Sequence, residues 1–557
     1  MVRPSRPRRS SATRGRVPAA TRPVTSSSPA APPPAWASLL LGAAFLALNL
    51  AWAPRASGGG DSSELTVVLA TLGLAHPTGY ALYTNLGHLF AVSLHACGAG
   101  WPWAANAWSA LGGAIALALW HALGARLLAR EGLSPWRAAG IALLPVIALG
   151  LDPAWTADAT TAEVYSWHMA WVAGFCLFAC STLADLSARS GDDRWVRRRT
   201  AWGGLLIGLG IAHHAMSLLV ALPLGIALLV SARPLRIPRL SPAAVGALVP
   251  LLAWSYVYYR SLHPAAAQWE SLGPGLRETW NHVTAAGYRH YLGGFAPSAP
   301  QREELASFVY PWLGPGLLAA LAWPFVRGAE PRVTRWALAA AALAQTTYVF
   351  LYRVLDPASY FLPVQALGLV LIPVVLASVR PVRRWGAALA GAAALGLALA
   401  AWPWTGAALE RRTTIEKADE FLRAMWRAVP IRRGYVIWDD DMCERLVQYQ
   451  LLDREKPELV VVGPRLLMDA GARALFARRH GVDPLGGGSP PADDMADRPD
   501  VIHRFADQVA EGINRGTRDS VIVFEPERPA LLLLPKTRPA SPGSADPERR
   551  EPGGGRR

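Results

Sequence analysis

The feature that most constrains this chain is a series of long apolar runs between residues 35 and 404, separated by short gaps that carry arginine. A membrane span needs about 20 apolar residues, and fewer where the helix is broken or buried in protein. Such runs occur at 36–53, 102–125, 138–151, 164–184, 202–212, 215–231, 242–258, 309–326, 336–351, 359–378 and 385–404. The pattern predicts a polytopic α-helical membrane protein with about eleven transmembrane helices.

The distribution of charge argues against a nucleic-acid-binding protein. The formal net charge is +15, yet charged residues make up only 17% of the sequence and hydrophobic residues 52%. Soluble domains carry about 25% charged residues. The arginines lie at the ends of apolar runs, where membrane proteins place them, and form no basic stripe of the kind that nucleic-acid binding needs. We therefore expect the lipid bilayer, and no nucleic acid, as a partner.

The chain divides into four predicted segments. Residues 1–34 contain seven arginines and no acidic residue, which predicts a disordered cytoplasmic tail. Residues 35–404 form the membrane domain. In residues 405–535, strand-like runs at 435–438, 459–462, 521–524 and 531–534 alternate with helical stretches at 415–429 and 443–452, which predicts a small α/β domain. Three aspartates at 439–441 favour a turn with a helix cap. Residues 536–557 are rich in Pro, Gly and Arg and should be disordered.

The arginine-bearing gaps alternate along the chain with gaps that are arginine-poor or long. Cytoplasmic loops carry the excess of arginine, so the basic N-terminal tail and every second gap are placed in the cytoplasm. An odd number of spans then places residues 405–557 on the outer side. The long gaps at 54–101 and 259–308, and the short ones at 152–163, around His213-His214 and at 352–358, become outer loops.

Two carboxylates follow the first apolar run. Asp61 and Glu64 are three residues apart, so a helix that starts at Asp61 places both on one side. A carboxylate beside apolar walls at a membrane surface can act as a general base. Spacing alone favours a different role, a helix cap at Asp61 with Glu64 completing a capping box.

The outer loops also hold cations, histidines and aromatic residues. Arginine suits phosphate, and aromatic rings suit lipid and the faces of sugars. Each arginine taken singly is more typical of an anchor at the membrane surface, and each histidine could equally pack helices together. The candidate binding residues are His76, Tyr80, Tyr83, Glu163, Tyr165, His213, His214, Arg260, Tyr288, Arg289, Arg353 and Asp356.

Several of these segments resemble one known family. The blocks are DSSE at 61–64, GLAHPTGYALY at 73–83, AEVYS at 162–166, GIAHH at 210–214, YRHY at 288–291, LDPASYFLP at 355–363 and PELVVV at 457–462. Their order is similar to that of the protein O-mannosyltransferase-like GT-C glycosyltransferases, a multipass family with bacterial members and an animal endoplasmic-reticulum member. Ser63 and Thr78 depart from the pattern, where glycine and proline are expected, and leave both carboxylates in place.

The resemblance implies a membrane glycosyltransferase that inverts the anomeric centre. Its donor would be a sugar, mannose by family, on a polyprenyl-phosphate carrier. Its acceptor would be a hydroxyl group, by family a protein Ser or Thr. Asp61 would deprotonate the acceptor, Glu64 would assist, and outer arginines would stabilise the phosphate leaving group. No metal and no cofactor is expected. We expect a multi-pass protein of the inner membrane of a bacterium, with the N-terminus in the cytoplasm and the C-terminal domain outside, as the arginine pattern predicts.

Two other classes of protein, a transporter and a scaffold, are alternatives to a glycosyltransferase. A transporter or flippase of lipid-linked sugars commonly shows repeated halves, and the sequence shows no internal repeat. A non-catalytic scaffold that binds through its outer domain is the third class. Neither of them accounts for the acidic pair after the first span.

The predicted topology is testable with reporter fusions. A reporter that works only outside the cytoplasm should be active after Glu410 and silent after Arg137, because only the second position lies in an arginine-rich gap. A cytoplasmic reporter should give the reverse pattern. Cytoplasmic activity after Glu410 would contradict the orientation and the outer location of the acidic pair.

Overall fold

The structure is a computed structural model. It describes residues 33–534, except 233–236, 268–271, 295–296, 354–355, 380–384, 439–442, 492–498 and 526–529. The predicted tails, apart from the prolines at 33 and 34, and the run of three aspartates lie outside the described residues.

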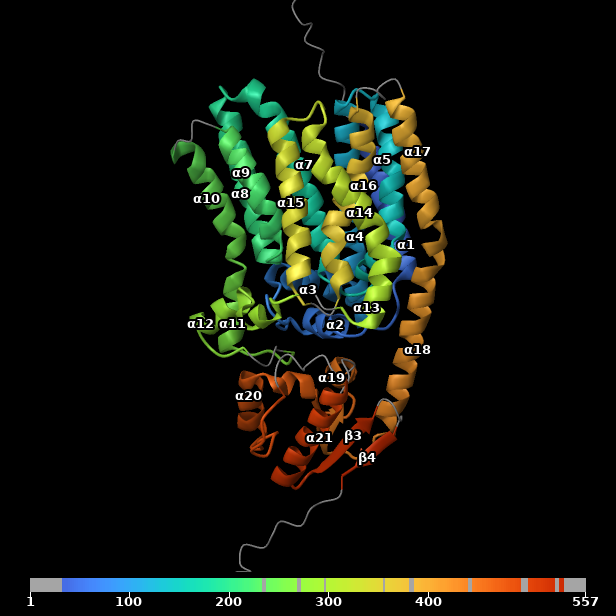
Figure 1. Ribbon diagram of the computed structural model, residues 1–557. Helices are drawn as coiled ribbons and strands as arrows, with labels where there is room; N and C mark the ends of the chain where they lie inside the picture. Colours follow the sequence, from blue (N-terminus) through green and yellow to red (C-terminus); the bar gives the residue numbers. More distant parts are fainter. Residues whose placement is uncertain are drawn as a thin grey trace, which may run out of the picture.

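All eleven predicted membrane segments are helical. They correspond to α1 (Ala35–Trp52), α4 (Trp101–Arg130), α5 (Pro135–Leu151), α7 (Tyr165–Arg189), α8 (Asp193–His213), α9 (Ser217–Ser231), α10 (Ile237–Leu251) with α11 (Trp254–Leu262), α14 (Tyr310–Ala322), α15 (Arg332–Leu351), α16 (Pro357–Ser378) and α17 (Gly386–Ala401). Most of them stand upright and side by side in Figure 1. A polytopic helical architecture is therefore confirmed.

The exact number of spans stays a prediction. Among the described residues, six helices are long and apolar enough to cross a membrane, or up to eight if each of two bent helix pairs is one span. One bent pair joins α5 to α6 (Pro153–Thr160) at 71°. The helix α9 has only 15 residues, whereas α8 and α15 carry arginines in their first turns. These three helices span only if neighbouring protein covers part of their length.

The helix α4 runs through the centre of the bundle and packs against α1, α5, α7 and α16. Its side chains Trp120, Leu117 and Leu123 are fully buried. A Cβ atom at Gly113 would lie 2.9 Å from the Cβ of Ala159, so glycine is needed there for close approach to α6. Small residues allow membrane helices to pack at short range.

Shorter elements lie across the end of the bundle that faces the C-terminal domain (Figure 1). They are α2 (Asp61–Thr71), α3 (Ala81–Ala96), α12 (Leu276–Val283), the 3₁₀ helix η1 (Ala286–Tyr291), α13 (Ala299–Glu304) and the π-helix η2 (Leu305–Val309). A 3₁₀ turn, η3 (Trp323–Phe325), follows α14. In Figure 1, α2 and α3 lie just below the upright helices, between them and the C-terminal domain.

The C-terminal region forms the predicted small α/β domain. Its strands β1 (Gly434–Trp438), β2 (Leu459–Val462), β3 (Ser520–Glu525) and β4 (Ala530–Leu533) form one sheet in the order β2-β1-β3-β4. The strand β1 is parallel to β2 and β3, in the register Gly434↔Leu459 and Gly434↔Ser520, and β3 is antiparallel to β4. The remaining elements are α19 (Cys443–Leu452), η6 (Pro464–Met468), α20 (Ala470–His480) and α21 (Pro499–Gly516).

A long helical run joins the two parts. The helix α17 continues through η5 (Trp402–Gly406) into α18 (Ala407–Ala428), and 42 residues from Ala387 form one run. The predicted domain boundary at 404/405 falls inside η5. At the far end, Leu422 and Trp426 of α18 pack in the core of the C-terminal domain with Val436 and Trp438 of β1. Figure 1 shows α18 descending along one side of the molecule to the sheet.

Candidate active site

The acidic pair is positioned by the turn that starts α2. Gly60 has φ 52° and ψ −129°, a conformation that favours glycine, and α2 begins at the next residue. Asp61 and Glu64 therefore lie in the first helical turn, where the helix dipole stabilises negative charge. Within the described part of the chain, neither side chain caps the helix. The capping box favoured by the spacing is not formed.

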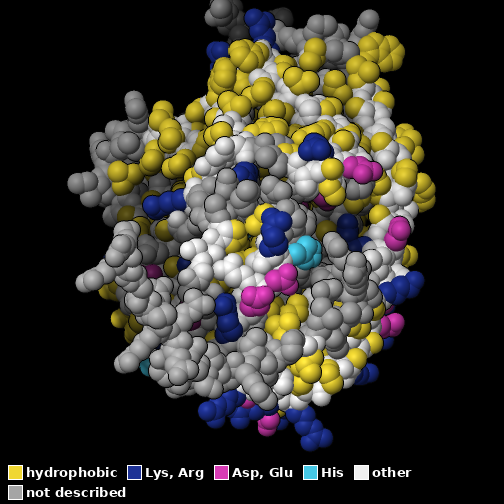
Figure 2. All heavy atoms as spheres, turned by 60° about the horizontal axis from the view of Figure 1, so that its bottom comes forward, with side chains coloured by type: hydrophobic (Ala, Val, Ile, Leu, Met, Phe, Trp, Pro, Cys, Tyr) yellow, Lys and Arg dark blue, Asp and Glu magenta, His cyan; other side chains and the backbone are white. Residues whose placement is uncertain are grey.

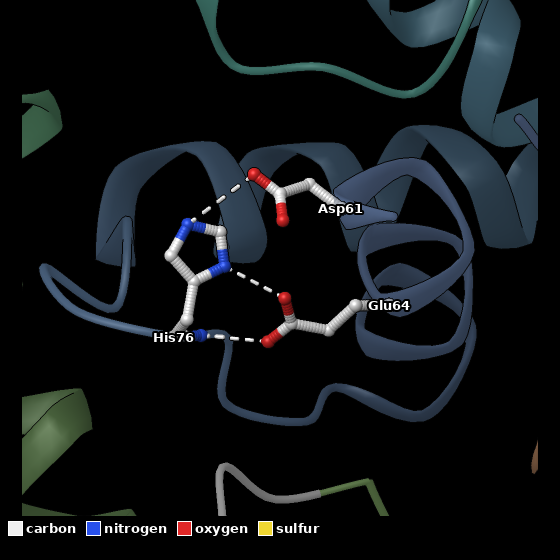
Figure 3. A group of neighbouring side chains, drawn as sticks. All are labelled: Asp61, Glu64 and His76. Atoms are coloured by element: carbon white, nitrogen blue, oxygen red, sulfur yellow. Dashed lines mark hydrogen bonds and ion pairs between the residues drawn. The ribbon is translucent and has the colours of Figure 1, made fainter. Parts of the chain in front are cut away.

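Both carboxylates face His76 instead, as Figure 3 shows. Glu64 accepts hydrogen bonds from the backbone N–H and from ring Nδ1 of His76, each at 2.7 Å. Asp61 Oδ2 lies 3.6 Å from Nε2 of the same ring. The hydroxyl of Tyr80 is 3.1 Å from that Nε2. The histidine predicted to bind substrate thus holds the two acids in place.

The two acids differ in exposure. The Glu64 side chain is 12% exposed and engaged by two short hydrogen bonds, whereas the Asp61 side chain is 54% exposed. Burial alone would lower the pKa of His76, but the charges of Asp61 and Glu64 outweigh it and raise that pKa from 6.5 to about 9. His76 is accordingly an imidazolium at neutral pH, paired with both carboxylates.

A cavity of about 680 Å³ opens beside this cluster, between the helical bundle and the C-terminal domain. The predicted residues that line it are Asp61, Glu64, His76, Tyr80, Glu163, Tyr165, His214, Tyr288, Arg353 and Asp356. They come from five loops or loop ends that are far apart in the sequence. In Figure 2, which turns the C-terminal domain forward, charged side chains gather in the lower half of the view and hydrophobic ones in the upper half.

An aromatic wall runs along the cavity. Tyr80 stacks on His214 with ring centroids 5.6 Å apart, and Tyr165 lies 5.7 Å from the same histidine. The wall continues from Tyr165 to Tyr360 at 5.4 Å and from Tyr360 to Tyr352 at 5.8 Å. Rings of this kind offer flat apolar faces with a polar edge, which suits a sugar or a lipid chain.

One of the predicted arginines reaches the cavity. The backbone N–H of Arg353 donates to the carbonyl of Tyr291 at 2.9 Å, which fixes its loop against η1. Two further acids line the same cavity, of which Glu163 is partly buried and Asp356 is exposed. Burial raises the pKa of Glu163 well above its usual range, and the charge of Asp61 adds to the effect. Desolvation by the surrounding protein also raises the pKa of Asp356, and the backbone N–H and hydroxyl of Ser359 donate hydrogen bonds to that carboxylate. Asp61 is exposed as well, and among these three acids it is the one that faces His76 (Figure 3).

Four predicted residues do not line the cavity. Tyr83 is buried against Trp108, and ring Nε2 of His213 lies 3.2 Å from the carbonyl oxygen of Val164, the residue before α7. Arg260 is partly buried and lies over the rings of Tyr256 and Tyr259, while Arg289 is exposed on η1. For Tyr83 and His213 the geometry matches helix packing.

The C-terminal domain supplies residues that were not predicted for the site. Glu444, Arg465 and Trp438 all line the cavity. Glu444 follows β1 and Arg465 follows β2, at the carboxyl ends of two parallel strands. Ligand sites of open parallel sheets form at that edge. The strand pattern of residues 435–462 therefore carried a signal that could have found them.

Asp61, Glu64 and His76 also form the group of described residues that could offer three ligand atoms to a cation, since these atoms lie within 4.8 Å of one another. In the cluster as it stands, His76 is paired with both carboxylates. A cation would have to displace the ring proton of His76 in order to bind there.

A helical bundle and a C-terminal α/β domain that close over one acidic cavity define a membrane protein with the GT-C fold. The apo structure of ArnT from Cupriavidus metallidurans has a TM-score of 0.50 at 15% identity, with 88% of this chain and 93% of ArnT covered. The same ArnT bound to undecaprenyl phosphate aligns at 0.49 with 14% identity, covering 88% and 93%. The oligosaccharyltransferase from Archaeoglobus fulgidus, tethered to an acceptor peptide, aligns at 0.46 with 13% identity, covering 87% and 68%.

Residues 61–236 match the family described as the protein O-mannosyl-transferase TMEM260 N-terminal domain. This match confirms the resemblance seen in the sequence, and it starts at Asp61 itself. No curated protein sequence matches the chain closely enough to count as a relative.

The charge on His76 makes stability depend on pH. The folded pKa of about 9 lies above the ordinary 6.5, so the stabilisation is fully present below pH 6.5 and is lost as pH rises through 9. It amounts to about 3 kcal/mol at most. The difference in Tm between the wild-type protein and His76→Gln, measured in detergent by thermal unfolding, should shrink between pH 6 and pH 9.5. A difference that stays constant over this range would show that His76 is neutral.

Proposed function

We propose that this chain is a membrane glycosyltransferase that works at the outer face of its membrane. It transfers a sugar, mannose in keeping with the family match, from a polyprenyl-phosphate carrier to a hydroxyl acceptor such as a protein Ser or Thr. The observation that carries the proposal is a half-exposed Asp61, backed by His76 and Glu64, in one cavity with Arg353. The proposal places this cavity outside the inner membrane of a bacterium.

The two acids take different roles in this mechanism. Glu64 accepts two hydrogen bonds from His76, one on each carboxylate oxygen, so both oxygens already hold the loop. Asp61 is half exposed, and the one contact described for its carboxylate is 3.6 Å long. Asp61 is therefore the base that takes the acceptor proton. The imidazolium of His76 keeps the Asp61 carboxylate oriented toward the cavity.

The transfer is a single displacement. The acceptor oxygen attacks the anomeric carbon, its proton passes to Asp61, and the bond from the anomeric carbon to the phosphate oxygen breaks. Attack from the side opposite the leaving group inverts the anomeric centre. The lipid phosphate leaves as an anion and needs no proton, and the guanidinium of Arg353 stabilises its charge. The aromatic wall holds the sugar and the first part of the lipid.

Asp61→Asn should lose transfer activity without unfolding. Asparagine is nearly isosteric but takes no proton, and general-base catalysis typically contributes 10²–10⁴-fold. The measurement is turnover of undecaprenyl-phosphate mannose, labelled in the sugar, with a Ser/Thr-rich peptide as acceptor. Binding of undecaprenyl phosphate to the same preparation should be unchanged.

Glu64→Gln is the matched comparison and should lose less turnover than Asp61→Asn, because Glu64 acts through His76. If both variants turn over normally, the catalytic reading of α2 is wrong. If Glu64→Gln is inactive while Asp61→Asn is normal, the roles are reversed. Carrier lipid that crosses the membrane without any transfer would identify a flippase.

Arg353→Gln should weaken binding of undecaprenyl phosphate about 10- to 100-fold, the usual worth of hydrogen bonds to a charged group. Arg289→Gln is the control, since Arg289 is exposed on η1 and does not line the cavity. Equal losses in the two variants would mean that the phosphate does not lie beside Arg353.

Turnover should persist in excess EDTA, because the proposed leaving group is stabilised by arginine and the imidazolium of His76 occupies the cluster. Activity that disappears in EDTA and returns with a divalent cation would assign a metal to Asp61, Glu64 and His76.

A further inference from the structure

The segment before α2, at Ser57 and Gly58, is hydrogen-bonded to the C-terminal domain. Arg445, on α19, is 1% exposed and lies against this segment. Its Nη2 donates to the backbone carbonyl of Gly58 at 2.8 Å and also to that of Ser57. On its other side, Nη1 lies 3.8 Å from the carboxylate of Asp419 in α18. One guanidinium thus joins α18 and α19 to the chain just before the acidic pair.

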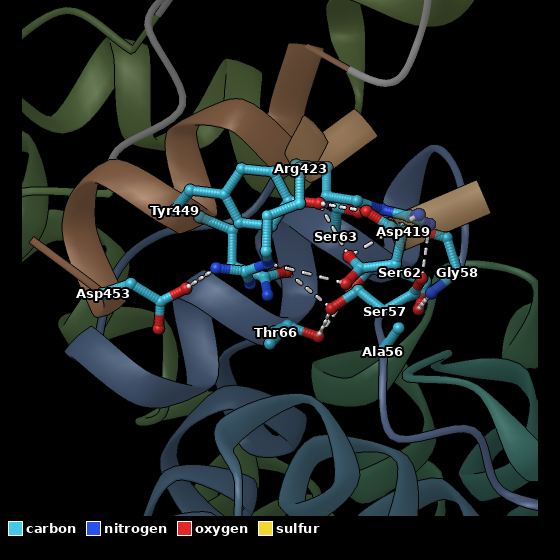
Figure 4. Close-up of polar contacts among 12 residues, drawn as sticks. Ala56, Ser57, Gly58, Ser62, Ser63, Thr66, Asp419, Arg423, Tyr449 and Asp453 are labelled. Atoms are coloured by element: carbon cyan, nitrogen blue, oxygen red, sulfur yellow. Dashed lines mark hydrogen bonds and ion pairs between the residues drawn. The ribbon is translucent and has the colours of Figure 1, made fainter. Parts of the chain in front are cut away.

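A second contact lies one turn further along α19. The hydroxyl of Ser57 donates to Oε1 of Gln448 at 2.6 Å, and both side chains are buried. Ser57 Oγ also lies 3.0 Å from Oγ1 of Thr66 in α2. Figure 4 shows Ser57, Gly58 and Thr66 meeting the C-terminal domain in one polar network.

Gly58, which the C-terminal domain contacts, is also hydrogen-bonded to the first turn of α2. Gly58 N–H donates to the hydroxyl of Ser62 at 3.0 Å, and the hydroxyl of Ser63 donates to the Gly58 carbonyl at 2.8 Å. Residues 58–60 are all glycine, and a glycine run has the most backbone freedom of any segment. Without an anchor, this run would let the first turn of α2, and Asp61 with it, take many positions.

Stability alone does not explain a buried arginine at this point. Taking a guanidinium out of water is costly, and well-packed apolar residues of similar volume are often as stable or more so. What the arginine provides is a planar group whose Nη2 donates to two neighbouring carbonyl oxygens while its Nη1 faces Asp419. Such a group fixes the geometry of a backbone turn in a way that an apolar side chain does not.

We propose that Arg445, assisted by Gln448, is a positioning residue through which the C-terminal domain sets the place of Asp61 in the cavity. The inference rests on the proposed function, because it assigns Asp61 the role of base. The same helix α19 carries Glu444 into the cavity wall, one residue earlier. In this view the C-terminal domain completes the catalytic site of the membrane domain.

The first test compares kinetics in the full-length protein. Arg445→Lys keeps the charge but loses the planar guanidinium that contacts the two carbonyls and Asp419 together, so turnover of undecaprenyl-phosphate mannose onto a Ser/Thr-rich peptide should fall. A displacement of about 1 Å in a catalytic group costs up to about 100-fold, so kcat should fall roughly 10- to 100-fold. The KM for the donor lipid should stay unchanged, because Arg353 and the tyrosine wall belong to the membrane domain.

The matched control is Arg423→Gln. Arg423 lies on α18 and pairs with Asp453 at 2.9 Å and Glu455 at 3.2 Å, inside the C-terminal domain. It approaches the same Asp419 as Arg445, at 3.8 Å. This variant should keep the kcat of the wild type. If it loses as much kcat as Arg445→Lys, general damage to the domain explains both results and the inference is overturned.

A second readout does not depend on activity. Hydrogen exchange of the backbone amides at 57–64 should be faster in Arg445→Lys and in the milder Gln448→Leu, and unchanged in Arg423→Gln. Unchanged exchange in both α19 variants overturns the inference, whatever the kinetics show. If exchange rises but Asp61→Asn turns over normally, the proposed function has failed and the structural clamp stands.

Discussion

Two hydrogen bonds from His76 to one carboxylate hold together the end of the helical bundle that faces the C-terminal domain. Glu64 accepts both, and they tie the first turn of α2 to the loop before α3. The helix α2 has only 11 residues, and helices of that length are marginal in water without tertiary support. Leu65 and Leu69 of α2 pack in one cluster with the aromatic residues of α3 and α4. The histidine therefore adds a polar clasp to an apolar contact, and the wall of the cavity is built on both.

Much of the architecture could be predicted because its causes are local. Apolar runs of span length became helices at all eleven places, and the four strand-like runs became the four strands within one residue at each end. The acidic pair was also found from spacing, although spacing favoured a capping box. That alternative failed because His76, twelve residues away from Glu64, competes for the carboxylate more strongly than the backbone of α2 does.

The parts that could not be predicted depend on contacts between distant segments. Arginine at an outer loop has the same sequence pattern whether it binds phosphate or anchors to the membrane surface, and only the fold separates Arg353 from Arg289. Nothing in residues 54–64 indicated that the C-terminal domain would reach them. Glu444 and Arg445 are adjacent on one helix, yet one faces the cavity and the other grips the backbone at Ser57.

The continuous helix from α17 into α18 has a mechanical consequence. A run of 42 residues is a rod about 63 Å long, rooted in the bundle and ending in the core of the C-terminal domain. Arg411 fixes the rod partway along by donating to Thr156 and to the carbonyl of Pro153. Each residue of an α-helix adds about 1.5 Å and about 100° of rotation. The number of residues in α18 after Arg411 therefore sets the height and rotation of the C-terminal domain. Inserting or deleting one residue would rotate α19 about the helix axis and move the cavity residues of the C-terminal domain away from those of the bundle. The helix should tolerate substitution far better than insertion or deletion.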